Sequence, residues 1–491
     1  MTLEQTKQPE LLDVGPHRGI WVDGSGRPAS DDATFSVLDP ATGRVVAEVS
    51  DGSVADAAAA VAAADRALPG WAATPPRQRA EMLRRAFDLM VADTDTLARL
   101  ISAENGKSRA DARAEVAYAA EFFRWFGEEA VRTEGAYGVS PQGGTRTVVT
   151  HRPVGVAALV TPWNFPAAMA TRKIAPALAA GCSVVLKPAA ETPLTALALA
   201  QALSRAGVPD GVVNVVPTTD PAAVVSAWLD DPRVRKLSFT GSTGVGRRLL
   251  AQAAQRVVNT SMELGGNAPF VVTADADVQA AVAGALVAKF RNGGQACTAA
   301  NRFFVHEDVR AEFTARFGAA VEAFTVGPAC QDSSQLGPLI SSQARDQIVA
   351  LVERAVGQGA RISHRGSAPS EGWFYPPTVL VDVPADADIL DAEIFGPVAP
   401  VVAWSDEDDM VRMANATEMG LAAYVYSGDL GTAMRIGERL EAGTVGVNRG
   451  IVSDPAAPFG GLKQSGVGRE GAREGIRAFQ ETQYLSLEWS P

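Results

Sequence analysis

Apolar residues recur every three or four positions along the first part of the chain. This spacing predicts amphipathic helices over residues 54–68, 75–100 and 115–131. The third helix carries aromatic residues on about one face, which we interpret as core packing. They are Tyr118, Phe122, Phe123 and Phe126.

From residue 154 onward, short apolar runs alternate with segments of helical spacing. Strands of this length between helices are typical of parallel β-α-β units whose sheets are covered on both faces. The first group of runs lies at 154–161, 183–186, 212–216, 237–240 and 268–272, and a second group lies at 302–305, 378–381, 398–403 and 444–447. We therefore predict an α/β fold with two lobes and a cleft between them.

Two further segments have the pattern of exposed strands. Residues 135–151 are rich in glycine and threonine, which indicates a projecting hairpin or a linker, and residues 483–488 alternate like an edge strand. An unpaired strand edge can pair with another copy of the chain, so both segments are candidates for subunit contact.

The composition is that of an ordinary globular protein, with 47% hydrophobic and 20% charged residues in a chain of 491. This length suits about three domains. The net charge of −12 makes nucleic acid a poor partner. The most apolar stretch, 174–186, is shorter than the ~20 residues that a membrane span needs. Because the first residues also lack the pattern of a secretory signal, we expect a cytoplasmic protein with no membrane partner.

Cysteine and histidine are scarce. Cys182, Cys297 and Cys330 form an odd set spread along the chain, which argues against a disulfide framework and for a reducing compartment. The 4 histidines lie far apart, and no Cys/His pair has the short spacing of a zinc site. We predict no metal site.

Cys297 follows Gly293 and Gly294, where a tight turn could present its thiol to a cleft. A lone cysteine is usually a small buried hydrophobe, but this one has polar neighbours. A thiolate nucleophile needs a base or oriented backbone N–H groups, and with so few histidines we expect a carboxylate base. The candidate is Glu263, beside Gly265 at the end of an apolar run that would raise its pKa toward neutrality. Most glutamates, however, are solvated surface groups.

Three predicted strands end in residues suited to a ligand, and the carboxyl ends of parallel strands meet at one edge of a sheet. Asn164 follows the first strand and could donate an amide N–H to an oxyanion. The turn at Gly241 and Ser242 precedes a helix whose free N–H groups could hold a pyrophosphate. Lys187 could meet a ribose or a phosphate. Each of these residues also has a simpler interpretation. Asn164 could be a structural residue in a turn flanked by prolines, the turn at Gly241 could be an ordinary glycine-rich turn, and Lys187 could be a solvated surface lysine.

Seven motifs, in order over nearly the whole chain, resemble those of the aldehyde dehydrogenase superfamily. They lie at 162–166, 187–189, 239–242, 263–267, 294–297, 393–397 and 458–466. The resemblance implies a Rossmann-type cofactor lobe (1–134 and 154–262), an α/β catalytic lobe (263–465) and a small oligomerisation hairpin (135–153 and 480–491). It also implies a homodimer or a homotetramer.

The resemblance further implies a covalent mechanism. Cys297 would attack an aldehyde, its backbone N–H and the Asn164 side chain would hold the oxyanion, and hydride would pass to NADP or NAD. Glu263 would then activate the water that hydrolyses the thioester to a carboxylic acid. Lys187 and Glu393 would bind the two riboses, Ser242 and Trp163 the pyrophosphate, and Phe395 would pack beside the nicotinamide ribose. The candidate cofactor-binding residues are Thr161, Trp163, Lys187, Ala190, Glu191, Gly241, Ser242, Glu393 and Phe395.

Within the superfamily the chain is most similar to succinate-semialdehyde dehydrogenases, in which two arginines and a serine bind the substrate carboxylate. The matching positions are Arg172, Arg291 and Ser453. Arginine suits this task because its planar fork can form two parallel hydrogen bonds to a carboxylate. Either arginine could instead form an internal salt bridge.

Other functions stay open at this point. Glutarate semialdehyde or a neutral aldehyde could be the substrate, because one methylene discriminates by only about 1 to 3 kcal/mol. A cysteine-dependent hydrolase or acyltransferase would use Cys297 but would not need the cofactor residues. A non-catalytic relative would be expected to lack Cys297 or Glu263, and both are present.

Two positions depart from the family pattern. Ala299 stands where several relatives carry a second cysteine, which excludes a disulfide switch there. Ala190 stands where relatives that prefer NAD usually carry a ribose-binding glutamate, and the missing carboxylate leaves room for the 2′-phosphate of NADP. Glu191, next in the chain, keeps NAD open.

Overall fold

The computed structural model describes residues 18–489, and the ends of the predicted cofactor lobe and hairpin, 1–17 and 490–491, lie outside these residues. The first sheet has eight strands. In sheet order they are β2 (Ser25–Arg27), β1 (Ile20–Val22), β9 (Val213–Val215), β8 (Ser183–Lys187), β7 (Val156–Val160), β10 (Val234–Thr240), β11 (Asn259–Glu263) and β21 (Gly466–Val467). From β9 to β11 the neighbouring strands are parallel, as the helical connections between them require.

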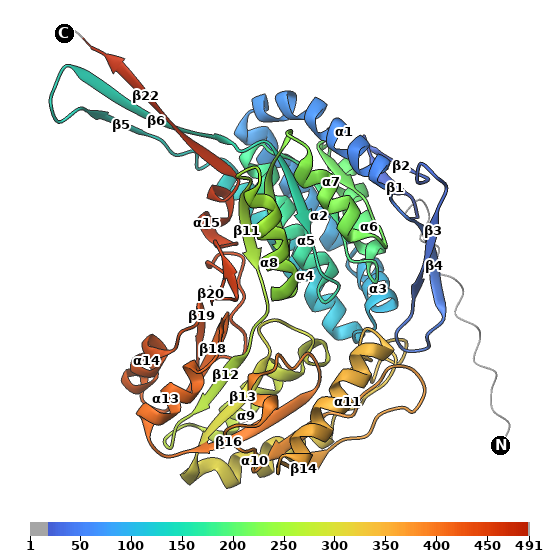
Figure 1. Ribbon diagram of the computed structural model, residues 1–491, viewed down its shortest axis with the longest axis vertical. Helices are drawn as coiled ribbons and strands as arrows, with labels where there is room; N and C mark the ends of the chain where they lie inside the picture. The colour runs from blue at the N-terminus through green and yellow to red at the C-terminus, as the bar shows by residue number, and fades with distance from the viewer. Residues whose placement is uncertain (1–17, 490–491) are drawn as a thin grey trace.

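Helices cover both faces of this sheet (Figure 1). One layer contains α2 (Pro76–Ala92), α3 (Thr94–Asn105), α4 (Arg109–Ala130), α5 (Pro166–Ala180) and α6 (Pro193–Arg205), and the other contains α1 (Val54–Ala73), α7 (Pro221–Asp230) and α8 (Thr243–Ala254). In β7, Ala157 and Leu159 join the core of the first layer, whereas Val156, Ala158 and Val160 join that of the second. A strand buried on both faces needs apolar residues throughout, which explains the continuous apolar runs of the sequence.

The predicted helices are confirmed with one change. Residues 75–100, expected as one helix, form α2 and α3, which are separated at Asp93 (φ −95°, ψ 16°). In α4, the three phenylalanines of the aromatic stripe are fully buried, as expected of core packing. Tyr118 is only partly buried, and its hydroxyl contacts Arg172.

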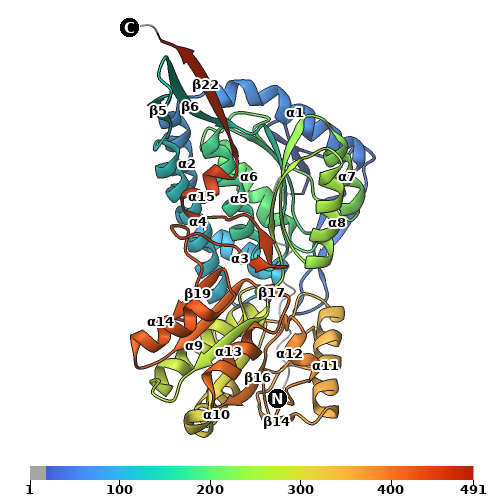
Figure 2. The ribbon, with the colours of Figure 1, turned by 60° about the vertical axis from the view of Figure 1, so that its left-hand side comes forward.

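The second sheet has seven strands and forms a separate layered lobe (Figure 2). In sheet order the strands are β14 (Arg361–Arg365), β15 (Thr378–Val381), β16 (Val398–Trp404), β13 (Ala300–His306), β12 (Ala268–Val272), β18 (Ala422–Tyr426) and β19 (Thr444–Val447). The helices of this lobe are α9 (Val278–Phe290), α10 (Glu307–Glu322), α11 (Ser342–Gly357), α12 (Asp388–Asp391), α13 (Glu407–Asn415) and α14 (Leu430–Arg439). The predicted pair of α/β lobes is therefore confirmed.

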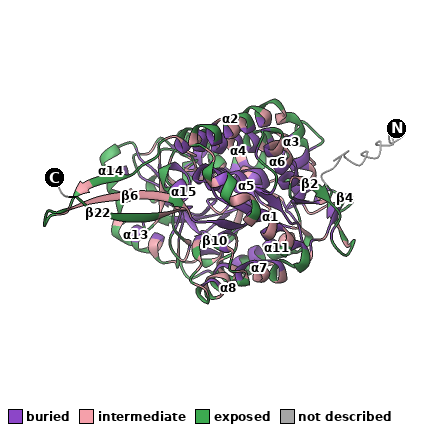
Figure 3. Ribbon diagram, turned by 90° about the horizontal axis from the view of Figure 1, so that it is seen from above, coloured by how far each residue is buried: buried purple, intermediate pink, exposed green. Residues whose placement is uncertain are grey.

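A three-stranded sheet projects from the first lobe (Figures 1 and 2). It consists of β22 (Gln480–Glu488), β6 (Thr145–Pro153) and β5 (Ala136–Val139), in that order, so residues 135–151 form a hairpin and not a linker. α15 (Ala472–Arg477) leads into β22. Most of β22 is exposed (Figure 3). Large apolar side chains such as Tyr137 and Tyr484 are exposed on this sheet.

Short paired strands complete the described chain. They are β3 (Thr34–Leu38) with β4 (Val45–Ser50), and β17 (Met419–Gly420) with β20 (Leu462–Lys463). Among residues 18–489, no helix is both long enough and apolar enough to cross a bilayer.

Candidate active site

The carboxyl ends of β7, β10 and β11 meet residues of the second lobe around a pocket of about 230 Å³. Seven residues singled out in the sequence line this pocket. They are Trp163, Asn164, Gly241, Ser242, Cys297, Glu393 and Phe395. The rings of Trp163 and Phe395 meet edge to face with centroids 5.5 Å apart, and together they form one wall.

A larger cavity of about 640 Å³ adjoins this pocket, and the two share Gly241 and Ser242. Four further predicted residues at the ends of β7 and β8 line it. They are Thr161, Lys187, Ala190 and Glu191. The other side of the cavity is apolar, with Phe239, Val225 and Leu249 suited to a flat ring. Thr218, Arg248 and Gln252 also line the cavity, and the sequence did not predict them because they belong to no motif.

A left-handed turn carries Cys297 into the smaller pocket. After α9, the short 3-10 segment Arg291–Gly294 has positive φ at Asn292 (53°), Gly293 (62°) and Gly294 (78°). A Cβ at position 294 would lie 2.2 Å from the carbonyl oxygen of Gly396, so only glycine fits there. Within residues 18–489 the Cys297 backbone N–H has no acceptor, which leaves it free to donate to a ligand beside the thiol.

Gly266 lies directly against this turn. A Cβ at position 266 would lie 2.3 Å from the carbonyl oxygen of Cys297, and the Gly266 N–H donates to Glu393 Oε1 (3.0 Å). Gly266→Ala should therefore displace the thiol and lower kcat/KM by about 100-fold, since small misplacements of reacting groups have effects of this size. Gly70→Ala is the matched control, because its Cβ would meet no atom within 4 Å. Equal kcat/KM in Gly266→Ala and Gly70→Ala would show that the turn carrying Cys297 accommodates the added methyl group without loss of activity.

The Cys297 thiol is accessible but hard to ionise. Burial raises its pKa to about 12, Glu393 and Glu263 act in the same direction, and Arg172 and Arg291 oppose them. The side chain is only partly buried, because it opens to the pocket. At neutral pH the thiol therefore holds its proton, and the site needs a base.

The raised pKa predicts how Cys297 reacts with iodoacetamide. The alkylation rate should increase about tenfold per pH unit from about pH 6 to 9 without levelling, because the thiolate fraction grows in this way below the pKa. The measurement uses Cys330→Ser, which removes the exposed thiol, while Cys182 is buried. A plateau near neutral pH would contradict the raised pKa.

Asn164 is held through its backbone, and its amide nitrogen is free. Its carbonyl oxygen accepts from Lys107 Nζ (2.7 Å) and from the Asn292 amide (2.8 Å), and its Oδ1 accepts from the Phe165 N–H (3.1 Å). Nδ2 donates to no atom of the described chain. Because Asn164 and Cys297 line the same pocket, this amide and the Cys297 N–H form a candidate pair of oxyanion donors.

A buried ion pair stands behind Asn164, and the sequence did not predict it. Lys107 Nζ lies 2.5 Å from Glu115 Oε2, and both side chains are fully buried. Glu115 Oε1 accepts from the Ala167 N–H (2.8 Å) at the start of α5. Asn105 Nδ2 donates to the Trp163 carbonyl (2.9 Å). The end of α3 and the first turns of α4 thus fix the backbone that carries Trp163 and Asn164.

β11 brings Glu263 to the same region, behind the pocket lining. Both carboxyl oxygens of Glu263 are buried and without hydrogen bonds among the described residues. Burial raises the pKa of this group well above its usual value, the charge of Glu470 adds to the effect, and Lys173 and Arg172 oppose it. A carboxyl group with a raised pKa is a stronger base than a solvated one, which suits it to general base catalysis. A water molecule or a rotation of the side chain would connect it to Cys297.

Arg172 lies in α5 within an aromatic box. Its guanidinium stands 4.1 Å from the Phe459 ring centroid and 5.2 Å from that of Phe122, and it donates to the Tyr118 hydroxyl. Burial opposes its charge, but Tyr118, Glu470 and Glu263 raise its pKa. Tyr118 therefore belongs to the site as well as to the core, which its place in the aromatic stripe did not reveal.

The internal salt bridge considered for Arg172 is only partly formed. Glu470 Oε1 receives a close contact from Lys173 Nζ (2.6 Å), whereas Glu470 Oε2 lies 3.9 Å from Arg172 Nε. Glu470 Oε2 and Arg172 Nε are both buried, and neither forms a hydrogen bond among residues 18–489. The sequence did not predict Lys173 or Glu470 as site residues.

Arg291 and Ser453 lie in different surroundings. Arg291 stacks on Phe165 (5.0 Å to the ring centroid), has no carboxylate within 4 Å in the described part of the chain, and acts on the pKa of Cys297. Ser453 is half-buried in the loop after β19, the loop that also carries Phe459. Its side chain forms no hydrogen bond with either arginine in the described structure.

The two predicted ribose-binding residues sit at opposite ends of the cleft. Burial lowers the pKa of Lys187 to about 8, and the charge of Glu191 opposes the shift. Burial raises the pKa of Glu393 to about 7, and the hydrogen bond from Gly266 opposes it. The Glu393 side chain is still exposed to the open cleft, so we expect its full shift only when a ligand covers it.

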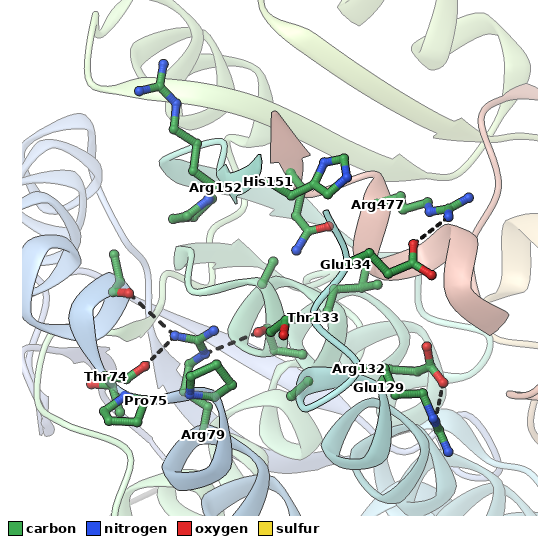
Figure 4. Close-up of a pocket in the computed structure, with 18 of the residues that line it drawn as sticks. Thr74, Pro75, Arg79, Glu129, Arg132, Thr133, Glu134, His151, Arg152 and Arg477 are labelled. Carbon is green, nitrogen blue, oxygen red and sulfur yellow. Dashed lines mark hydrogen bonds and ion pairs between the residues drawn. The ribbon is translucent and has the colours of Figure 1, made fainter. Parts of the chain in front are cut away.

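A third cavity, of about 350 Å³, lies at the base of the projecting sheet and contains none of the predicted site residues. Figure 4 shows Arg79 donating to backbone carbonyls, among them that of Thr74 (2.6 Å). Glu129 pairs with Arg132, and Glu134 pairs with Arg477 (2.7 Å). Most charges here are satisfied within the chain, and we assign this cavity no part in the chemistry.

Comparisons with known proteins show the family to which the chain belongs. Residues 27–485 match the model of the aldehyde dehydrogenase family. A succinate-semialdehyde dehydrogenase of Paenarthrobacter nicotinovorans is 54% identical over 90% of this chain and 99% of its own. A glutarate-semialdehyde dehydrogenase of Pseudomonas aeruginosa is 47% identical over 95% of this chain and 97% of its own. The crystal structure of a succinate-semialdehyde dehydrogenase from Burkholderia pseudomallei superposes with a TM-score of 0.95 at 46% identity, covering 99% of this chain and 100% of that one.

Proposed function

Because the chain belongs to the aldehyde dehydrogenase family, we propose that it oxidises succinate semialdehyde to succinate with NADP or NAD as hydride acceptor. The observation that carries this proposal is the convergence of a thiol and two candidate oxyanion donors on one pocket, with a buried carboxyl group and two arginines beside it. Glutarate semialdehyde is the second candidate, because a relative 47% identical bears that name.

The larger cavity fits a nicotinamide dinucleotide. It offers the buried Lys187 ammonium, the backbone N–H groups at the start of α8, and an apolar slot. The cofactor, when bound, supplies the hydride acceptor. Ala190 leaves space for a 2′-phosphate, whereas the Glu191 carboxylate favours a free 2′-hydroxyl, so we propose that both NADP and NAD are used.

Acylation begins when the Cys297 thiol passes its proton to a water molecule in the open pocket and Sγ bonds to the aldehyde carbon. The carbonyl oxygen becomes an oxyanion, which the Cys297 N–H and Asn164 Nδ2 stabilise. When the C=O bond reforms, hydride leaves the same carbon, and a thioester remains on Cys297.

In deacylation, Glu263 acts as the base. Its carboxylate takes a proton from a water molecule, and the water oxygen bonds to the thioester carbon. The C–S bond then breaks, the carboxylic acid is released, and the sulfur regains its proton. A base with a raised pKa suits this step, because it holds an accepted proton more firmly than a solvated carboxylate does and can return it to the sulfur.

The substrate carboxylate would meet Arg172 and Arg291, with Ser453 as a further donor. The charges of both arginines act to lower the pKa of the Cys297 thiol, which supports a place for the substrate anion near it. The aromatic box around Arg172 limits its rotation, which favours one orientation of the guanidinium fork.

We further propose that copies of the chain associate through the projecting sheet of β5, β6 and β22, as a homodimer or homotetramer. The support is the exposed apolar surface of that sheet and its open strand edges. The three free cysteines support a reducing compartment, and we propose the cytoplasm.

Removal of one arginine tests the proposed function. Arg172→Ala should lower kcat/KM for succinate semialdehyde by about 30- to 100-fold, mainly through KM, because a charged hydrogen bond contributes about 2 to 3 kcal/mol. The effect on butanal should be much smaller. Arg291→Gln, which leaves no carboxylate unpaired, should behave in the same way. If both variants lost kcat/KM equally for the two aldehydes, the arginines would have a structural role and would not bind the substrate carboxylate.

A further inference from the structure

A cavity of about 260 Å³ lies between the β3–β4 hairpin, α3, the start of α4 and the loop at 328–330. It shares no lining residue with the catalytic pocket or the cofactor cavity. The proposed reaction leaves it without a role.

The lining of this cavity is positively charged. Arg44, Arg99 and Arg109 line it, and none of them has a carboxylate within 4 Å among residues 18–489. Asp39 is the single acidic residue of the lining, and its carboxylate accepts from the Ala41 N–H (2.8 Å) and the Thr42 hydroxyl (3.0 Å). These donors are neutral, so Asp39 offsets one of the three arginine charges, and the lining keeps a formal charge of +2.

Two buried polar atoms of the lining lack partners. The Ser102 hydroxyl belongs to a side chain only 5% exposed, and it forms no hydrogen bond within the described chain. Arg109 Nε is likewise buried and unpaired there. Such atoms are unfavourable unless something accepts from or donates to them, and a rotation of either side chain toward the cavity would let a bound anion accept from it.

The rest of the wall is apolar, with Val46, Ala103, Pro328 and Ala329. Three arginines and a hydroxyl beside an apolar wall match a carboxylate on a short hydrocarbon body. We propose that this cavity binds a small organic carboxylate, at a site distinct from the active site.

The cavity is joined to the catalytic pocket through α3. Gly106 lines the cavity, and its two chain neighbours hold the active-site backbone: Asn105 binds the Trp163 carbonyl and Lys107 binds the Asn164 carbonyl. A ligand that shifts Gly106 therefore acts on the oxyanion donor Asn164. The site can regulate the proposed reaction, although binding itself does not depend on that reaction.

Cys330 provides a local reporter, because it lines the cavity and is exposed. In Cys297→Ala, with Cys182 buried, Cys330 is the accessible thiol, and its reaction with the neutral reagent 4,4′-dithiodipyridine can be followed by absorbance. At constant ionic strength, butyrate should slow this reaction saturably, by about threefold at twice its dissociation constant. Butyramide, which has the same shape without the charge, should not.

Two arginine variants localise the effect. Arg109→Gln and, as a second and more exposed position, Arg99→Gln should abolish protection by butyrate. Arg113→Gln is the matched control on α4, because Arg113 pairs with Asp95 and does not line the cavity, and it should retain protection. Protection by butyramide, protection that survives in both cavity variants, or no saturable protection by butyrate would overturn the proposal. Because Cys297→Ala cannot turn over, none of these outcomes depends on the dehydrogenase activity.

Discussion

Glu263→Gln is expected to lower steady-state aldehyde oxidation by about a thousandfold while preserving one turnover of reduced cofactor per active site. The amide cannot take a proton from water, so the thioester on Cys297 should accumulate after hydride transfer. The side chain has no hydrogen bonds to lose, because both carboxyl oxygens are unpaired within residues 18–489, and the fold should therefore tolerate the change.

Rapid-mixing absorbance at the wavelength of reduced nicotinamide measures this burst, and mass spectrometry of the Cys297 peptide detects the acyl group. Cys297→Ala is the control and should show neither signal. Steady-state turnover near that of the unmodified protein would remove Glu263 as the deacylation base. A slow reaction with no burst would instead place its action before hydride transfer, on the proton of Cys297.

Lys107→Met should have the second large effect, on both stability and catalysis. The substitution leaves the Glu115 carboxylate buried without its partner, 2.5 Å from where the ammonium stood. Breaking a buried pair in this way costs about 3 to 5 kcal/mol of unfolding free energy. It also removes one of the two donors that hold the Asn164 carbonyl and leaves only the Asn292 amide, so kcat should fall by at least about tenfold.

A double variant separates these two effects. Lys107→Met combined with Glu115→Gln removes the lone charge and should recover most of the stability, but not kcat, because Asn164 still lacks its support. Denaturant unfolding and steady-state kinetics measure the two quantities. Arg113→Gln, which breaks the exposed pair with Asp95, should change stability by less than about 1 kcal/mol. Recovery of kcat together with stability would contradict a positioning role for Lys107.

The fold could be predicted from the sequence wherever burial leaves a continuous apolar run. β12 (Ala268–Val272) and β15 (Thr378–Val381) lie at the predicted residues, because each strand sits inside a sheet and needs apolar side chains along its length. The break between α2 and α3 could not be predicted in this way. Asp93 interrupts the helix by its backbone angles, while the apolar spacing continues on both sides.

The residues of the candidate site also fall into two groups, those that the sequence could predict and those that it could not. Cys297, Asn164 and Glu263 lie in motifs with glycines or prolines that mark special backbone, so the sequence could single them out. Lys107 and Glu115 could not be found, because charged residues at helical spacing look like a solvated face until the fold buries them. Lys173 and Glu470 lie 297 residues apart and meet only in three dimensions.

The initial rate of reduced-cofactor formation tests the central claim most directly. The unmodified protein is assayed with succinate semialdehyde and with butanal, each with NADP and with NAD. We expect a kcat/KM at least about 30-fold higher for the semialdehyde, the ratio that one charged hydrogen bond to its carboxylate would give. Equal rates for the two aldehydes would contradict recognition of the carboxylate by Arg172 and Arg291, and no reduction of either cofactor would contradict the dehydrogenase activity itself.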